Sequence, residues 1–132
     1  MRANLLTAIT SATSTLTQFA VSQELPWAQN GDPLYRKNMK KIYVDTPTTE
    51  QSTIIYTFEK TRNVDEVVYT CNVYVAVDAK NPPSQTNQVI EKILDCKGLT
   101  GLVSYDDESD YSVEQDEDKL IYTIEFRSNV AT

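Results

Sequence analysis

The stretch Glu66–Asp78 (EVVYTCNVYVAVD) constrains the fold of this chain most strongly, because its apolar residues fall on alternate positions. Successive side chains of a β-strand point to opposite faces, so an extended conformation places this apolar set on one face. An α-helix would scatter the same residues around its circumference. The stretch therefore predicts a long central strand whose apolar face must be covered and whose edges must be paired. That face consists of Val67, Tyr69, Cys71, Val73, Val75 and Val77.

Length and composition limit the size of the domain and the class of protein that contain this strand. The chain has 132 residues, which is the size of one domain with a single core, and we expect one domain over residues 1–132. Apolar residues make up 40% and charged residues 23%, as in ordinary globular proteins. A net charge of −7 excludes a general binder of nucleic acid or of membrane surfaces, because either would need a basic surface.

The N-terminal residues 1–20 do not have the continuous apolar core of a signal peptide, because threonine and serine interrupt them. No run approaches the roughly 20 apolar residues of a membrane span. Without a secretory signal, we expect Cys71 and Cys96 to be reduced thiols in a cytoplasmic environment. A disulfide between them stays open as the alternative.

Two segments have the spacing of amphipathic helices. Residues 3–20 carry apolar side chains three and four positions apart, although their threonines are poor helix formers. A second helix is expected from Asn81 or Ser84 to about Lys97, where Gly98 suits a left-handed cap. We expect both helices to cover the same face of the sheet. Their buried stripes are Leu5, Leu6, Ile9, Ala12, Leu16, Phe19 and Ala20 in the first, and Val89, Ile90, Ile93 and Leu94 in the second.

Further strands are expected at residues 41–46, 51–60, 99–105 and 119–128. The tetrapeptide Arg62-Asn63-Val64-Asp65 is typical of a turn and would join the second of these strands to the central one in an antiparallel hairpin. The predicted fold is α+β: a mainly antiparallel sheet of roughly four to five strands with two helices packed on one face. The expected core is Leu5, Ile9, Leu16, Phe58, Tyr69, Val73, Val75, Ile90, Ile93, Leu94, Tyr122 and Ile124.

A long connection over residues 22–41 carries aromatic and basic side chains. Connections of this length are often functional. It could be a solvated turn whose aromatic residues pack on the core, or a contact loop that presents them to a partner. The candidate contact residues are Trp27, Tyr35, Arg36, Lys37, Lys40 and Lys41.

Little in the sequence points to catalysis. The chain has no histidine, so Ser-His and Cys-His pairs are impossible, and its three glycines form no phosphate-binding loop. Two isolated cysteines do not make a structural zinc site without histidines or further thiolates. We therefore expect no enzyme, no cofactor and no metal.

The acidic segment at 106–118 is the remaining chemical candidate. A calcium loop would need glycine at its sixth position, and Tyr111 stands there. The segment is best interpreted as a solvated turn that blocks edge-to-edge pairing of sheets. It could also dock a basic patch, and a head-to-tail contact with residues 36–41 of an identical subunit would close into a ring. Its carboxylates are Asp106, Asp107, Glu108, Asp110, Glu114, Asp116, Glu117 and Asp118.

The order of these elements resembles that of a tail terminator (tail completion) protein of long-tailed bacteriophages. The likeness spans most of the chain. It is carried by KIYVD after the long connection, by VVYTCNVYVAV, by NPPSQTNQVIEKI and by the ending KLIYTIEFRS after an acidic turn. These are similarities of order and texture rather than an invariant motif, and other phage neck or head-closure proteins share them.

The resemblance implies a structural protein of the virion without catalytic residues. It implies a hexameric ring at the tail–neck junction that caps the tail-tube protein and contacts the head connector, while DNA passes through the hole without specific binding. Two other classes stay open. One is a monomeric protein-binding module that uses Val68, Tyr74 and Ile121 on the outer sheet face, and the other is a metal-dependent enzyme on the acidic segment.

Overall fold

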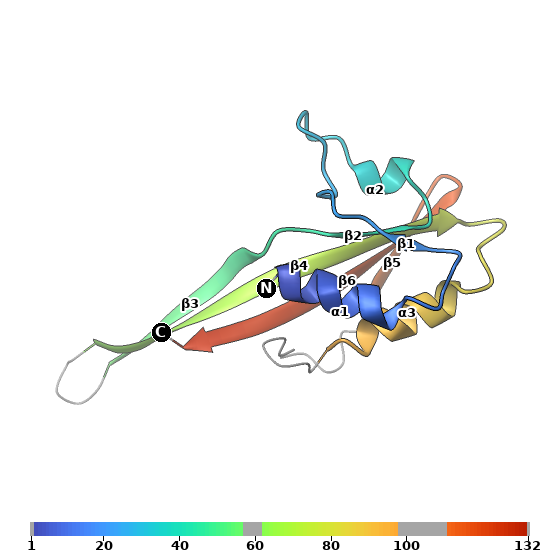
Figure 1. Ribbon diagram of the computed structural model, residues 1–132. Helices are drawn as coiled ribbons and strands as arrows, with labels where there is room; N and C mark the ends of the chain where they lie inside the picture. The colour runs from blue at the N-terminus through green and yellow to red at the C-terminus, as the bar shows by residue number, and fades with distance from the viewer. Residues whose placement is uncertain (1, 57–61, 98–110, 132) are drawn as a thin grey trace.

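The computed structural model describes residues 2–56, 62–97 and 111–131. The predicted α+β class is confirmed, with three helices in these ranges rather than two (Figure 1). The elements are α1 (Arg2–Ala12), β1 (Ala20–Val21), α2 (Leu34–Lys37), β2 (Lys41–Val44), β3 (Thr48–Tyr56), β4 (Arg62–Asp78), α3 (Thr86–Leu94), β5 (Ser112–Asp116) and β6 (Lys119–Ala131).

The strands form one six-stranded sheet with β4 at its centre. Its order is β1-β2-β4-β6-β5, and β3 continues along the same edge of β4 that β2 occupies, after the link Asp45–Pro47. Every pairing is antiparallel except that of the two-residue β1 with β2. The mainly antiparallel sheet is confirmed, with more strands than expected because β1 and β5 were missed.

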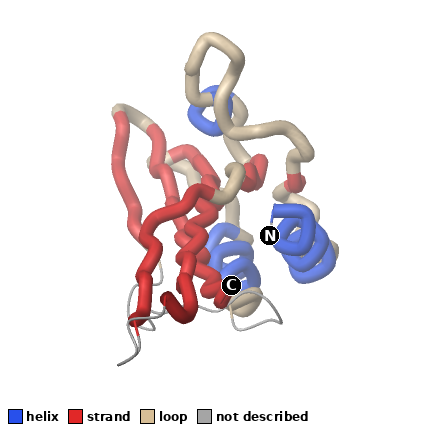
Figure 2. The backbone as a smooth tube through the Cα atoms, turned by 90° about the vertical axis from the view of Figure 1, so that its left-hand side faces the viewer, coloured by secondary structure: helices blue, strands red, loops and turns tan. Residues whose placement is uncertain are grey.

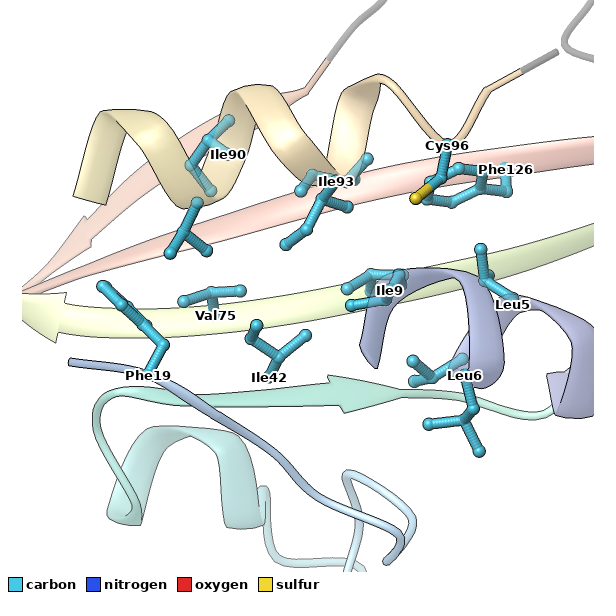
Figure 3. Close-up of a cluster of buried hydrophobic side chains, with 14 of the residues drawn as sticks. Leu5, Leu6, Ile9, Phe19, Ile42, Val75, Ile90, Ile93, Cys96 and Phe126 are labelled. Carbon is cyan, nitrogen blue, oxygen red and sulfur yellow. The ribbon is translucent and has the colours of Figure 1, made fainter. Parts of the chain in front are cut away.

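The helices α1 and α3 pack side by side on one face of the sheet, as predicted. Figure 3 shows Ile9 of α1 and Ile93 of α3 directed toward the strands around Val75. Alternate residues of β4 from Cys71 to Val77 have no exposed surface. Their burial against both helices produces the main core. This core contains Leu5, Leu6, Ile9, Leu16, Phe19, Ile42, Val44, Cys71, Val73, Val75, Val77, Val89, Ile90, Ile93, Cys96, Ile124 and Phe126.

Most of the expected core residues are buried. The confirmed ones are Leu5, Ile9, Leu16, Val73, Val75, Ile90, Ile93 and Ile124. Three others, Tyr69, Leu94 and Tyr122, are half-buried, and of these Leu94 and Tyr122 pack against the core. Phe58 lies outside the described residues. The alternation of β4 therefore predicted the interior correctly where the helices cover it.

Both helices are shorter than predicted. The first ends at Ala12 rather than continuing to residue 20, and the hydroxyls of Thr10 and Thr13 bond to the carbonyls four residues earlier, at 2.7 Å each. Such bonds compete with regular helix geometry, and the threonine-rich segment continues as turns. The second helix, α3, begins at Thr86 and ends at Leu94, with turns up to Lys97.

Three strand assignments need correction. Arg62–Asp65 is not a turn but the beginning of β4, where Ile54 pairs with Asp65. Pairing with β3 overrides the turn preference of Asn63 and Asp65. The acidic segment is not wholly a loop, because Ser112–Asp116 forms β5. The final strand runs on to Ala131, and the expected strand at 99–105 lies outside the described residues.

The opposite face of the sheet is also covered, which the sequence did not predict. Tyr35 of α2 packs with Tyr43, Ala76 and Ile121 in a second, smaller core. Figure 2 shows α2 apart from α1 and α3. Ile121 is therefore 2% exposed and does not belong to an open outer face. The expectation that Ile121 contributes to an exposed binding surface is therefore wrong.

The helices cover part of β4 only. At about 3.3 Å per residue the 17 residues of β4 extend for ~56 Å. At 1.5 Å per residue the 11 residues of α1 and the 9 residues of α3 extend for about 16 and 14 Å. The strand β3, the first half of β4 and the end of β6 thus form a three-stranded extension that projects past the helices (Figure 1).

Val73→Asp should abolish folding, because it places a carboxylate in the fully buried centre of the main core. Circular dichroism and thermal melting check this. The matched control is Val113→Asp, the same change at a strand residue that is 47% exposed, which should melt like the parent. A soluble Val73→Asp variant with a cooperative melt would contradict this core.

Candidate functional site

The contact loop at 22–41 is a folded layer rather than a free arm. A short hairpin closes it, where the Leu34 amide donates to the Pro26 carbonyl at 2.7 Å and the Ala28 amide donates to Asp32 at 2.8 Å. Gly31 occupies its tip at φ +89°, a conformation that suits glycine. These main-chain bonds close the hairpin, and the Asn30 side chain adds a bond from the Asp32 amide at 3.1 Å.

Three aromatic rings attach the loop to the sheet. Tyr35 stacks on Tyr74 with ring centroids 4.4 Å apart, and Trp27 meets both rings edge-on at 5.4 and 5.9 Å. The Trp27 indole N–H donates to the Asp45 carboxylate at 3.1 Å. Such ring pairs stabilise beyond the area they bury. Tyr35 is 6% exposed, so it serves the core, whereas Trp27 is 41% exposed.

The basic cluster is partly used inside the chain. The Arg36 guanidinium pairs with the Asp116 carboxylate at 2.8 Å, and the Lys119 ammonium donates to the Arg36 carbonyl at 2.7 Å. Lys37 pairs with Asp32 at 3.4 Å. The predicted attraction between residues 36–41 and the acidic segment thus exists, but for Arg36 and Asp116 it joins α2 to the β5–β6 hairpin within one molecule. A hydrogen bond with Tyr35, followed by the charges of Asp116 and Glu114, raises the pKa of Arg36.

The remaining charges lie on opposite edges of the sheet. Lys40 and Lys41 are exposed where β2 begins, beside β1, and make no ion pair among the residues described. Glu114 lies on β5 at the other edge, and Glu117 and Asp118 form the turn into β6. All three acidic residues are exposed. The predicted residues Asp106, Asp107, Glu108 and Asp110 lie outside the described residues.

Within the described parts of the chain, no three cysteine, aspartate or glutamate side chains gather to hold a metal ion. The thiols are buried. Cys71 donates to the Asp45 carbonyl at 3.0 Å, and burial, then the Asp45 charge, raises its pKa from 9.0 to about 11. Burial also raises the pKa of Cys96. Neither thiol is placed to act as a nucleophile at neutral pH.

Two shallow hollows open on the surface. One of about 470 Å³ lies at the β1–β2 edge, near the beginning of α3, and is lined by Thr17, Gln18, Met39, Lys40, Asp78, Asn81 and Pro83. The other, of about 510 Å³, lies along α1 and is lined by Arg2, Ala3, Leu6, Thr7, Thr10, Ser11 and Gln23. In the second, Arg2 is already engaged by the carbonyls of Val44, Gln23 and Glu24.

Several exposed apolar residues were not among the predicted contact residues. Met39 is 39% exposed at the first hollow, and Tyr111 and Val113 are 46% and 47% exposed at β5. The alternate positions of Tyr111 and Val113 within the acidic segment are typical of an edge strand. The surrounding carboxylates favoured a loop instead, and the strand was not predicted.

No protein-family model matches this sequence, and no curated protein matches it. Among the described helices, none has the length and apolar character needed to cross a membrane. The features of the molecule that bear on its function are therefore the contact loop, the charged edges of the sheet and the three-stranded extension.

Tyr35→Ala should lower the free energy of unfolding by about 3 kcal/mol, since it removes a buried ring from both the second core and the aromatic stack. Denaturant unfolding followed by fluorescence checks this, because Trp27, the single tryptophan of the chain, contacts Tyr35 directly. Tyr111→Ala, at an exposed tyrosine, is the control and should cost under about 1 kcal/mol. Equal losses in the two variants would contradict the proposed packing.

Both thiols should resist labelling in the folded protein at pH 8 and react once it is unfolded. The raised pKa of Cys71 also links the stability of the fold to pH: the neutral thiol stabilises the folded state fully below pH 9.0, and this stabilisation is lost as the pH rises toward about 11. A chromogenic thiol reagent measures the rates, with Met39→Cys as an accessible positive control. Labelling of the parent as fast as this control would contradict the buried assignment.

Proposed function

We propose that this chain is a structural virion protein of a long-tailed bacteriophage, a tail terminator that forms a hexameric ring at the tail–neck junction. In this role it caps the last ring of the tail-tube protein and offers its other side to the head connector. The resemblance in element order and in the strand and helix segments supports this proposal.

The observation that carries the proposal is the three-stranded extension of β3, β4 and β6 beyond the helices (Figure 1). A self-contained binding domain gains nothing from a sheet that its helices do not cover. A subunit of an assembly can place such an extension against a neighbour, where strand backbones and side chains find partners. This favours an assembly component over a monomeric module.

The distribution of charge supports the same proposal. Within the part of the chain that the structure describes, Lys40 and Lys41 make no ion pair at one edge of the sheet. Glu114, Glu117 and Asp118 make none toward the opposite edge, which suits a head-to-tail contact between identical subunits. A net charge of −7 suits a ring through which DNA slides, because an acidic lumen repels the phosphate backbone and does not retain it.

Addition of the purified protein to polymerising tail-tube protein from the same genome should stop elongation and leave capped tubes of limited length. Electron microscopy measures the length distribution, and an antibody against the chain should label the neck end of complete tails. The folding-defective Val73→Asp variant is the control and should leave elongation unchanged.

Unlimited tube growth in the presence of the folded protein would overturn the terminator assignment. If the antibody nevertheless labels the neck, the protein is a head-closure component and not a terminator. If it labels no part of the particle, the virion assignment fails altogether.

A further inference from the structure

Two exposed patches of complementary chemistry lie on opposite edges of the sheet. We call Tyr111, Val113 and Glu114 the β5 patch, and we call the 470 Å³ hollow at the β1–β2 edge the Met39 hollow. In the sheet order β1-β2-β4-β6-β5, the strand β6 lies between β5 and β4, whose last residue, Asp78, lines the hollow, so the two patches do not meet within one molecule. A contact between them requires two molecules.

The β5 patch presents apolar groups on one face of an edge strand and a carboxylate on the other. Val113 pairs in register with Tyr122, and the Tyr111 ring lies 5.8 Å from the Tyr122 ring, so both residues belong to the helix-bearing face. Glu114 pairs in register with Ile121 on the opposite face. It is exposed, and among the described residues it makes no hydrogen bond or ion pair, although its charge helps to raise the pKa of Arg36.

The Met39 hollow offers an apolar wall beside a cation. Met39 is 39% exposed, and Lys40 lines the hollow next to it. The main chain of Lys40 is held firmly, since its amide donates to the Ala76 carbonyl at 2.9 Å and its carbonyl accepts from Ala20 at 3.1 Å. The other charged lining residue, Asp78, accepts a bond from the Lys80 amide at 2.9 Å. Among the described residues Lys40 makes no ion pair, so its ammonium remains available for a carboxylate.

We infer that Tyr111 of one copy docks in the Met39 hollow of the next copy, with Glu114 placed beside Lys40. A hollow of about 470 Å³ lies within the range that small organic groups fill, so it accommodates a phenol ring. The two patches differ, so the contact is head-to-tail and repeats around a ring. This inference rests on the proposed ring and names the surfaces through which its subunits meet.

Charge favours this arrangement over a symmetric pairing of two β5 strands. Each chain carries a net charge of −7, and a symmetric pairing would bring together two acidic hairpins with Glu114, Glu117 and Asp118 on each. The head-to-tail contact instead places one carboxylate of the hairpin beside a lysine of the neighbour. Opposite charges at such a contact also suppress the wrong orientation.

Cysteine cross-linking between two singly substituted proteins tests this contact, even where it is transient. Tyr111→Cys and Met39→Cys are mixed as full-length proteins at high concentration and oxidised, and the rate of disulfide-linked dimer formation is measured on a non-reducing gel. The natural thiols are buried and do not compete. Leu25→Cys mixed with Met39→Cys is the matched control, because Leu25 is 43% exposed but lies outside both patches.

The expected result is a mixed dimer that forms about tenfold faster than in the control. Glu114→Lys should remove this advantage, and Lys40→Glu on the partner should restore it. Equal rates in pair and control would overturn the inference, as would Tyr111→Cys linking to itself as fast as to Met39→Cys. A ring seen by sedimentation without this cross-link would refute the contact but leave the proposed function standing. A cross-link without any closed ring would refute the ring instead.

Discussion

The packing of both faces of β4 is the constraint on which the rest of the structure depends. Its residues from Cys71 to Val77 are buried at alternate positions by α1 and α3, while Ala76 is buried on the other face by the contact loop. A strand covered on both sides needs a partner on each edge, and β2 and β6 supply them. Each helix and the contact loop therefore has its position set by the same few residues.

Much of this arrangement was predictable from local patterns, and the errors share one cause. Period-two alternation predicted β4 and its buried face, and the spacing of Ile90 and Ile93 predicted α3. The errors fall where pairing or packing outweighs local preference. Asn63 and Asp65 are typical of turns but lie in β4, where Asp65 pairs with Ile54 of β3. The carboxylates around β5 are typical of a loop, although the segment forms a strand. The first helix was predicted too long because Leu16 and Phe19 are buried without being helical.

The candidate site shows what residue chemistry can predict without coordinates. The basic and acidic clusters were expected to attract one another, and Arg36 does pair with Asp116. The sequence could not say that this pair lies within one molecule, because that depends on the unforeseen strand β5 and on α2. Likewise, Trp27 and Tyr35 were treated as equivalent contact residues, yet their exposed fractions of 41% and 6% separate a surface residue from a core residue.

The covered half of β4 and the three-stranded extension differ in what they contribute to the stability of the domain. The covered half of β4 concentrates the apolar burial that holds the domain together, so the domain can fold without its extension being covered. The extension adds backbone hydrogen bonds but lies beyond both helices, and its ordering entropy is better offset when a neighbour packs against it. In the proposed ring, a subunit built in this way would fold alone and complete its packing on assembly. That coupling gives a physical reason for a small acidic domain to carry a strand as long as β4.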